Sequence, residues 1–504
     1  MKDDHWNGVL KKQTIGAIWL FGALPFLTLI GRNPGQSLPL LWLVAYWVIL
    51  CAIPSLVVIA VARKNENVAG RLAAVLALAI LVVGQLAVGL RKAIGLKPIF
   101  GVDGSVWLMA ILLVASILIS RWKWVQLYVP YLAVAILVAV SVQFVVNAVG
   151  VQPGSVASNP VTPMVLEPKE TPNVYWFVLD GYARGDVIAD IYEDPRQSLF
   201  LDELADRGFT VSGDARAAYP MTYLSIASTV SAEYVAAEGD SVNKVEPFHN
   251  RIRWDNRVVK TFRSWGYSYL LWPGDGWSGS ACGGVEDYCL GISSWIKEAD
   301  FALLSMTPLP HLFGTTGYEV HAERSDPVAV VETILAGEAD EPRFVFAHLM
   351  NPHPPYYWAG EECELQNVTF NLRGPFGKQP YVESIRCLNE RLISAVDRIL
   401  VADEDAIIIL QGDHGPSLGL SIFDAELDEW GEPQIMARFG VLSAMRAPPD
   451  CAVPDDLSLT NTFRVVFDCL SFDSVELLPT RMWIANQYPG LIREIDPHTL
   501  LPSK

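Results

Sequence analysis

Five long apolar runs in the first 150 residues limit the possible folds of this chain more than any other feature. They cover residues 14–30, 38–62, 72–90, 106–120 and 127–148. Most are close to the roughly 20 residues that a helix needs to cross a bilayer core of about 30 Å. A soluble core is the alternative, but five successive helices without a polar face do not suit one. We therefore predict an all-α transmembrane bundle of about five helices over residues 1–150.

Lys and Arg residues next to these runs predict the orientation of the bundle. Those at the ends that we expect to be cytoplasmic are Lys2, Lys11, Lys12, Arg63, Lys64, Arg71, Arg121 and Lys123. The opposite loops carry only Arg32, Arg91, Lys92 and Lys97. The first run has no small-residue cleavage site, so we interpret it as an anchor rather than a signal peptide. Because basic loops stay in the cytoplasm, we expect a multi-pass protein of the inner or plasma membrane whose C-terminal part lies outside the cytoplasm.

Composition changes at the end of the last run. Residues 151–172, rich in Pro, Ser and Val, predict a linker, and residues 173–504 predict one extracytoplasmic domain. Residues 1–150 carry a net charge of +8, which leaves −26 for the rest of a chain whose total is −18. Such an acidic domain would repel phosphates, so we expect no nucleic-acid partner. A high net charge also favours a soluble monomer, so we expect a monomer.

Six of the seven cysteines lie in the predicted outer domain. An even number of cysteines in an oxidising compartment favours disulfides over free thiols. Neighbours in the sequence would pair as Cys282–Cys289, Cys363–Cys387 and Cys451–Cys469, although six cysteines allow other connectivities. A zinc cluster is the alternative, but the chain contains no C-x-x-C pair that would support it.

Three continuous apolar stretches, at residues 173–179, 343–348 and 406–410, predict buried strands. Helix-like stretches such as 381–402 separate them, which indicates an α/β sheet covered on both faces. The strands lead in turn to Asp180, to His348 and His353, and to Asp413 and His414. Asp-Gly and Asp-His-Gly are common turns, but ligands bind beyond the carboxyl ends of such strands, so we expect one site to collect these residues.

The side chains at the strand ends suit a metal centre. Two carboxylates, from Asp180 and Asp413, and the imidazole of His414 form a ligand set for one divalent ion, Zn²⁺ or Mn²⁺. A metal-bound hydroxyl becomes a better nucleophile. Thr222 and Ser225 lie at the start of a predicted helix, where an anionic substrate is favoured. The alternative is that Thr222 is only a helix cap.

The order of these motifs resembles the alkaline phosphatase and sulfatase superfamily, and in particular membrane-bound phosphoethanolamine transferases and lipoteichoic-acid synthases. Those proteins combine five membrane helices with an outer catalytic domain, so the resemblance covers nearly the whole chain and implies a sulfatase-like α/β domain. It implies metal ligands at Asp180, Thr222, Asp413 and His414, the nucleophile at Thr222, a catalytic acid at His353, and substrate contacts at Ser225 and His348.

The sequence also departs from the family pattern. Many of the transferases have a further His-Gly pair after Asp-His-Gly, whereas residues 416–435 contain no histidine. Relatives often have Glu at the position of Asp180. The C/S-x-P-x-R motif that sulfatases convert to formylglycine occurs nowhere in the chain, which disfavours sulfate-ester hydrolysis. We interpret residues 438–444 as a strand and 459–464 as a capped helix.

Our leading functional hypothesis is a metal-dependent transferase. Thr222 would attack the phosphodiester of a membrane lipid donor and take its headgroup, phosphoethanolamine or phosphoglycerol. A glycan or lipid acceptor outside the cytoplasm would then receive the group, with His353 as acid and base. The alternatives are a phosphodiesterase or sulfatase-type hydrolase, in which water is the acceptor, and a catalytically inactive lipid sensor, which the retained ligand set disfavours.

Overall fold

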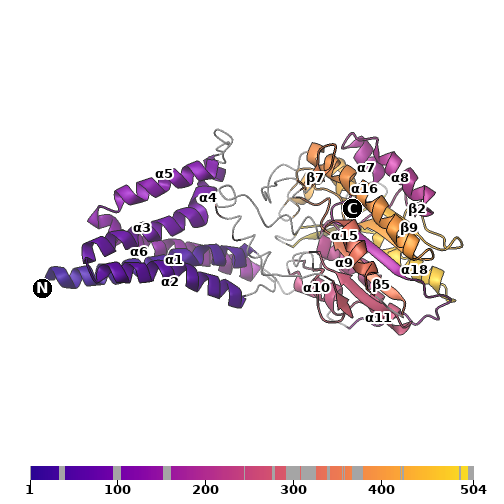
Figure 1. Ribbon diagram of the computed structural model, residues 1–504, viewed down its shortest axis with the longest axis horizontal. Helices are drawn as coiled ribbons and strands as arrows, with labels where there is room; N and C mark the ends of the chain where they lie inside the picture. Colours follow the sequence, from indigo (N-terminus) through magenta and orange to yellow (C-terminus); the bar gives the residue numbers. More distant parts are fainter. Residues whose placement is uncertain are drawn as a thin grey trace. The chain divides into compact units, whose positions relative to one another are not determined.

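The computed structural model divides into two compact units, one of residues 1–151 and 295–315, the other of residues 152–294 and 316–504 (Figure 1). The described residues are 2–32, 40–94, 104–150, 160–242, 244–274, 279–290, 303, 307, 325–337, 341–354, 356, 358–365, 378–420, 422, 425–486 and 490–497. The first unit is helical, and the second contains the sheet.

The first unit is an all-α bundle, as predicted. Its helices are α1 (Lys2–Arg32), α2 (Leu40–Ala62), α3 (Glu66–Leu81), the π-helical turn η1 (Val82–Leu86), α4 (Ala87–Ile94), α5 (Gly104–Ile119) and α6 (Lys123–Gly150). Within the described residues, three spans are long and apolar enough to cross a membrane, namely Leu41–Ala62, Asn67–Gly84 and Lys123–Val142. Ile15–Ile30 and Gly104–Ile119 are apolar but shorter, so the predicted number of about five helices is approximate.

The described part of the predicted linker, residues 160–172, is attached to the second unit. The Val161 N–H donates to the Asp255 carboxylate, and the Met164 N–H donates to Thr261 Oγ1 over 2.9 Å. Both partners lie about 95 residues further along the chain. This stretch therefore forms part of the surface of the second unit.

A seven-stranded mixed sheet forms the centre of the second unit. In spatial order its strands are β2 (Phe209–Val211), β9 (Ser443–Arg446), β8 (Ile407–Gly412), β1 (Val174–Leu179), β5 (Arg343–Leu349), β3 (Ser268–Trp272) and β4 (Tyr288–Cys289). The three predicted strands are β1, β5 and β8, and β1 pairs in parallel with both neighbours. Leu179 is in register with Leu349 and with Gly412, so the three strands end at the same edge.

Helices cover both faces of the sheet because side chains alternate along its strands. Trp176 and Val178 belong to the core on one face, and Tyr175 and Phe177 belong to the core on the other. The first face packs against α9 (Thr222–Ser231), α10 (Glu246–Arg253), α11 (Arg257–Ser264) and α18 (Thr462–Leu470). The second face packs against α7 (Gly185–Asp190), α8 (Gln197–Asp206), α15 (Pro327–Leu335) and α16 (Lys378–Ala402). The α/β fold class is therefore confirmed.

The C-terminal part of the chain differs from the prediction at one helix. Glu432–Phe439 form α17, whose first turn contains Pro433, so the interpretation of 438–444 as a strand is wrong for residues 438–442. The strand β9 begins only at Ser443. The predicted helix at 459–464 is confirmed, because the 3₁₀ turn η3 (Leu459–Asn461) leads directly into α18. Two small hairpins, β6 (Trp358–Ala359) with β7 (Glu364–Leu365) and β10 (Met482–Ala485) with β11 (Ile492–Ile495), complete the unit.

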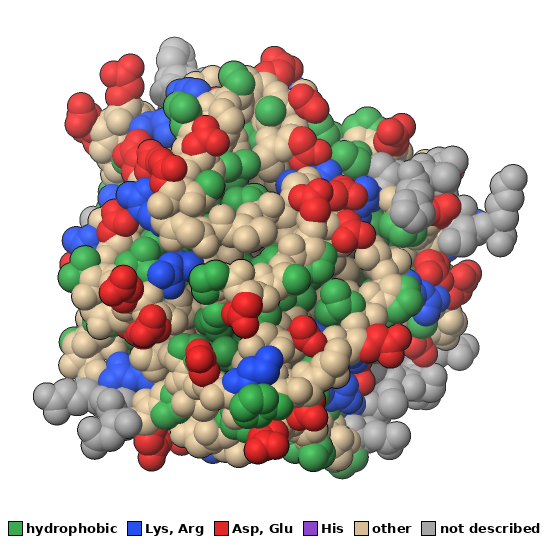
Figure 2. Space-filling model, turned by 90° about the vertical axis from the view of Figure 1, so that its right-hand side faces the viewer, with side chains coloured by type: hydrophobic (Ala, Val, Ile, Leu, Met, Phe, Trp, Pro, Cys, Tyr) green, Lys and Arg blue, Asp and Glu red, His purple; other side chains and the backbone are tan. Residues whose placement is uncertain are grey.

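The second unit also contains the three predicted disulfides. They join Cys282 to Cys289, Cys363 to Cys387 and Cys451 to Cys469. The free cysteine among the described residues is Cys51, which is buried in the helical unit. On the face drawn in Figure 2, acidic side chains are scattered between basic and hydrophobic ones.

Trp176 is the side chain whose removal we expect to weaken the sheet unit most. Its ring stacks on Phe346 at 4.4 Å and meets Phe463 edge-on at 5.0 Å, and it is 1% exposed. Trp176→Ala should lower the free energy of unfolding by about 3–5 kcal/mol because it leaves a large cavity. Pulse proteolysis of the full chain in urea measures this. The control Phe472→Ala, at a position 68% exposed, should change it by about 0.5 kcal/mol or less.

Candidate metal centre and nucleophile

Three predicted ligands converge at the edge where the central strands end. Asp180 follows β1 directly, and Asp413 and His414 follow β8. One ligand atom from each lies within 4.8 Å of the others, and all three side chains are at most 3% exposed. Because β1 and β8 run in parallel and end in register, the sheet itself places the two carboxylates side by side.

His414 presents its Nε2 atom to this cluster. Nε2 lies 3.3 Å from Asp413 Oδ2 and 3.7 Å from Asp180 Oδ1. On the other side of the ring, Nδ1 lies 3.0 Å from the Gly415 carbonyl oxygen. A carbonyl oxygen can only accept a hydrogen bond, so in the neutral ring Nδ1 carries the proton and Nε2 offers a lone pair. His414 is thus in the tautomer that a metal ligand requires.

Close backbone contacts shape the two loops that carry the ligands. Gly181 has φ +80°, a conformation that favours glycine, and its N–H donates to Asp413 Oδ1 over 3.0 Å. A Cβ atom on Gly415 would lie 1.9 Å from the Ala437 carbonyl oxygen, so the loop after His414 requires glycine there. The Asp-Gly and Asp-His-Gly sequences are turns, which is the simpler of the two interpretations. They also bring the predicted ligands together at one candidate site.

The electrostatics of the cluster suit a cation. Burial and the neighbouring Asp180 charge raise the pKa of Asp413 to about 7. Burial also tends to raise the pKa of Asp180. Electrostatic attraction to His353, and interactions with His348 and His414, outweigh burial and hold the pKa of Asp180 below its ordinary value. Among the described residues, neither Asp180 Oδ1 nor Asp413 Oδ2 has a hydrogen-bond partner. Burying a carboxylate oxygen without a partner lowers the stability of the folded state. One divalent cation could bind both oxygens and remove this penalty. The residues therefore fit a metal ion.

Thr222 reaches the same cluster from a helix N-terminus. It is the first residue of α9, and the N-cap is Met221, which makes no side-chain capping bond. The Thr222 Oγ1 atom lies 2.9 Å from His414 Nε2. The hydroxyl of Thr222 thus faces the metal centre instead of capping the helix, and the helix dipole favours an anion in front of it.

Ser225, which lies one turn further along α9, contacts the backbone of the metal centre. Its hydroxyl donates to the Asp413 carbonyl oxygen over 2.6 Å, and the side chain is 2% exposed. This contact ties α9 to the loop after β8. It favours a role in holding that loop over the substrate contact expected from the sequence.

The two histidines of the β5 region occupy different positions. His348 lies within β5 with a fully buried side chain, and its Nε2 is 3.4 Å from Asp180 Oδ2. His353 follows β5, is half-buried, and lies beside Gly181. Its Nδ1 is 2.7 Å from the Pro354 carbonyl oxygen, which leaves Nε2 as the nitrogen for acid–base work. The two histidines thus flank the turn at Asp180. His348 lies on its buried side and His353 on its more open side.

Arg438 is a site residue that sequence reasoning missed. It lies in α17 and is 5% exposed, and burial lowers its pKa to about 10. Its Nε donates to the Pro220 carbonyl oxygen, two residues before Thr222, and its Nη1 donates to the Gly415 carbonyl oxygen, both over 2.6 Å. One guanidinium therefore joins the loop before Thr222 to the loop after His414. Its charge also offsets those of the two aspartates.

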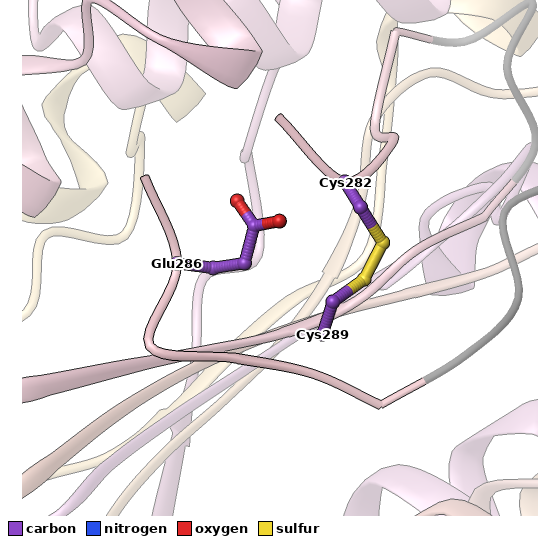
Figure 3. Close-up of side chains that lie close together, drawn as sticks. All are labelled: Cys282, Glu286 and Cys289. Atoms are coloured by element: carbon purple, nitrogen blue, oxygen red, sulfur yellow. A yellow bond between two sulfur atoms is a disulfide. The ribbon is translucent and has the colours of Figure 1, made fainter. Parts of the chain in front are cut away.

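A second group of possible ligands consists of Cys282, Glu286 and Cys289 (Figure 3). The two sulfur atoms are joined in a disulfide, so neither can serve as a thiolate ligand. The Glu286 carboxylate accepts hydrogen bonds from the N–H groups of Gly283 and Gly284. This group therefore closes a loop and is not a metal site.

We predict that Asp413→Ala abolishes metal binding, because it removes one of the three clustered ligands. Elemental analysis of the purified full chain should find one equivalent of Zn or Mn in the parent and almost none in the variant. The control Asp450→Asn, at an exposed carboxylate, should retain the parent content. Full metal content in Asp413→Ala would contradict the ligand assignment.

A comparison with solved structures matched several chains at low identity. The periplasmic domain of EcEptC from Escherichia coli is 14% identical, with 68% of this chain and 98% of that chain covered and a TM-score of 0.40. The integral membrane lipooligosaccharide phosphoethanolamine transferase A (EptA) from Neisseria meningitidis is 13% identical, with 91% and 95% covered and a TM-score of 0.40. The putative sulfatase yidJ from Bacteroides fragilis is 13% identical, with 64% and 83% covered and a TM-score of 0.39.

Sequence comparison supplies the family assignment. A search of curated proteins found no match. The sulfatase family model matches residues 172–437, which is more than half of the chain. The matched segment contains the whole cluster described above, from Asp180 through Thr222 to His414. The chain therefore belongs to the sulfatase family.

Proposed function

We propose that this sulfatase-family protein is a metal-dependent phosphotransferase that moves a phospholipid headgroup, phosphoethanolamine or phosphoglycerol, to a cell-envelope acceptor. The observation that carries the proposal is the position of Thr222. Its hydroxyl lies 2.9 Å from His414 Nε2, beside two buried carboxylates and at the N-terminus of a ten-residue helix. This arrangement supports a role for Thr222 as an activated nucleophile that faces an anionic substrate.

The first half-reaction forms a bond between Thr222 and the donor phosphorus. The helix N-terminus of α9 orients the phosphodiester, and Thr222 Oγ1 attacks phosphorus while its proton leaves to solvent. The bond from phosphorus to the glycerol oxygen of the lipid breaks, and His353 donates a proton from Nε2 to that oxygen. A divalent ion held by Asp180, Asp413 and His414 would acidify the threonine hydroxyl and neutralise charge on the phosphate oxygens. The products are diacylglycerol and a headgroup phosphoryl ester of Thr222.

The second half-reaction reverses these roles with a different alcohol. An acceptor hydroxyl of a glycan or lipid attacks the phosphorus, and His353 removes its proton. The bond to Thr222 breaks, and the threonine oxygen regains a proton. Hydrolysis would follow the same course with water as the acceptor, so the acceptor and not the nucleophile distinguishes a transferase from a phosphodiesterase.

Two further observations support a phosphoryl substrate in a lipid. The chain lacks the C/S-x-P-x-R motif from which sulfatases make formylglycine, and it has a threonine hydroxyl beside the candidate metal ligands. Three described helical spans are long and apolar enough for a membrane, where a phospholipid donor would be at hand. The motif that would favour a sulfate ester is therefore missing. The apolar helices would keep the protein in a membrane that contains the phospholipid donor.

We further propose that the sheet unit lies outside the cytoplasm. The basic residues beside the apolar runs favour this orientation. The three disulfides of the sheet unit suit an oxidising compartment. The donor headgroup and the acceptor would then both be reached from the outer face of the membrane.

The decisive variant for the nucleophile is Thr222→Ala. With phosphatidylethanolamine or phosphatidylglycerol labelled in the headgroup, the parent should release diacylglycerol, and Thr222→Ala should lower the rate by at least about 10³-fold because no covalent ester forms. The control Thr333→Ala removes an exposed threonine on α15 and should keep the parent rate. Equal release by the parent and Thr222→Ala would reject the nucleophile.

Orientation is tested with an engineered cysteine on the sheet unit. Val401 lies near the end of α16 and is 90% exposed. A membrane-impermeant maleimide should label Val401→Cys in intact cells, whereas the parent chain should stay unlabelled. Labelling that requires lysis of the cells would place the sheet unit in the cytoplasm and contradict the proposed orientation.

A further inference from the structure

Asp180 is flanked by two histidines, one facing each of its carboxylate oxygens. His414 Nε2 lies 3.7 Å from Oδ1, on the side of Asp413 and Thr222. His348 Nε2 lies 3.4 Å from Oδ2, on the opposite oxygen. The proposed mechanism uses the first histidine as a ligand and leaves the second without a role.

The position of His348 favours a supporting role over the substrate contact expected from the sequence. It lies in the centre of the sheet, on β5, where it is in register with Val178 of β1, and its side chain is fully buried. Its ring packs in a stacked arrangement against Phe346, with ring centroids 6.5 Å apart. A Cβ atom on Gly274 would lie 2.4 Å from His348 Nδ1, so the absence of a side chain at Gly274 makes room for the ring. The imidazole is therefore held tightly behind Asp180.

Asp180 and Ser280 face the two ring nitrogens of His348. The Gly274 N–H donates to Ser280 Oγ over 3.2 Å, and Ser280 Oγ lies 2.5 Å from His348 Nδ1. A carboxylate oxygen can only accept a hydrogen bond, so Asp180 Oδ2 favours a proton on His348 Nε2, and Nδ1 then accepts the hydrogen of the Ser280 hydroxyl. In the neutral ring the proton therefore lies on Nε2, the nitrogen that faces Asp180 Oδ2.

The two histidines thus adopt opposite tautomers for different tasks. His414 donates from Nδ1 to the Gly415 carbonyl and presents a lone pair at Nε2. His348 accepts at Nδ1 and presents a hydrogen at Nε2. A metal ligand needs the lone pair, and a group that orients a carboxylate needs the hydrogen.

We propose that His348 is a positioning residue that orients Asp180 for metal binding, with Ser280 holding it in the donor tautomer. The His348 Nε2–H directs one oxygen of Asp180 away from the centre, so that Oδ1 faces the space shared with Asp413 and His414. This inference rests on the metal site of the proposed function, and it is independent of the lipid donor and of the acceptor.

The chain Gly274–Ser280–His348–Asp180 links the metal centre to the disulfide loop. Ser280 lies two residues before Cys282, whose bond to Cys289 closes the loop before the end of β4. The Glu286 carboxylate fixes the same loop through the N–H groups of Gly283 and Gly284. The loop therefore holds Ser280 in a defined position, which it needs in order to keep the His348 proton on Nε2.

The test is the zinc affinity of the full chain, measured by competition with a chromophoric chelator and with zinc alone as the ligand. A Gln amide nitrogen reaches the position of His Nε2, whereas an Asn amide reaches only that of Nδ1. His348→Asn should therefore weaken zinc binding by about 10–100-fold, the usual effect of losing a partner of a metal ligand. His348→Gln should bind zinc within about threefold of the parent. Ser280→Ala should weaken binding by about threefold or more, because both tautomers of His348 become available.

The outcomes separate this inference from the proposed function. A parent chain that binds no zinc or manganese would remove the metal site and both proposals with it. Parent-like affinity in His348→Asn and Ser280→Ala would overturn the positioning role and leave the metal site intact. Equal weakening by His348→Gln and His348→Asn would also overturn it, because the Nε2 donor would not be the cause. If His348→Asn does not fold, Ser280→Ala, which loses one hydroxyl, decides alone.

Discussion

The candidate site of the sheet unit depends on two carboxylates held close together away from water. Asp180 and Asp413 are each at most 3% exposed, and like charges at short range in a medium of low dielectric constant repel strongly. The protein offsets part of this repulsion with the N–H of Gly181, the buried guanidinium of Arg438 and the neighbouring imidazoles. One oxygen of each aspartate is left for a cation. This pair explains why tight turns and buried polar contacts meet at one edge of the sheet. Each of these contacts either offsets the charge of a carboxylate or holds it in place.

The rest of the fold makes that pair possible. Parallel strands that are apolar on both faces form a rigid base, and the register of β1 with β8 determines the spacing of the two aspartates. Helix α9 then brings Thr222 to the same point, and Ser225 ties the helix to the Asp413 backbone. The Tyr381 hydroxyl of α16 donates to the Gly181 carbonyl over 2.9 Å and so holds the Asp-Gly turn from the other face of the sheet. Layers on both sides of the sheet therefore contribute to one small site.

Much of this arrangement was predictable from the sequence, because the ligands follow their strands directly. A strand that ends in Asp-Gly and another that ends in Asp-His-Gly must place these residues at one edge once the strands are parallel neighbours. Pairing each cysteine with the next cysteine along the chain also predicted the three disulfides. The apolar runs indicated the helical bundle, and the number of membrane-spanning helices stays approximate within the described residues.

The supporting residues were not predictable in this way. Arg438 contacts Pro220, which lies 218 positions earlier, and Ser280 contacts His348, which lies 68 positions later. Such contacts depend on how helices and loops pack, and no local pattern marks a single arginine or serine as a partner. The sequence interpretation also places Arg438 in a strand, whereas it lies in α17. The position of His348 behind Asp180, on the side away from Thr222, follows from the register of β5 and is not visible in the order of the motifs.

The central claim is that Thr222 forms a covalent ester with the donor headgroup, and mass spectrometry of the trapped enzyme tests it most directly. The full chain is incubated with phosphatidylethanolamine or phosphatidylglycerol in the absence of an acceptor, quenched in acid and digested. We predict that the peptide containing Thr222 gains the mass of the headgroup phosphoryl unit, with the fragment ions placing it on Thr222. Turnover of the donor with Thr222 unmodified, or a modification on another residue, would contradict the account.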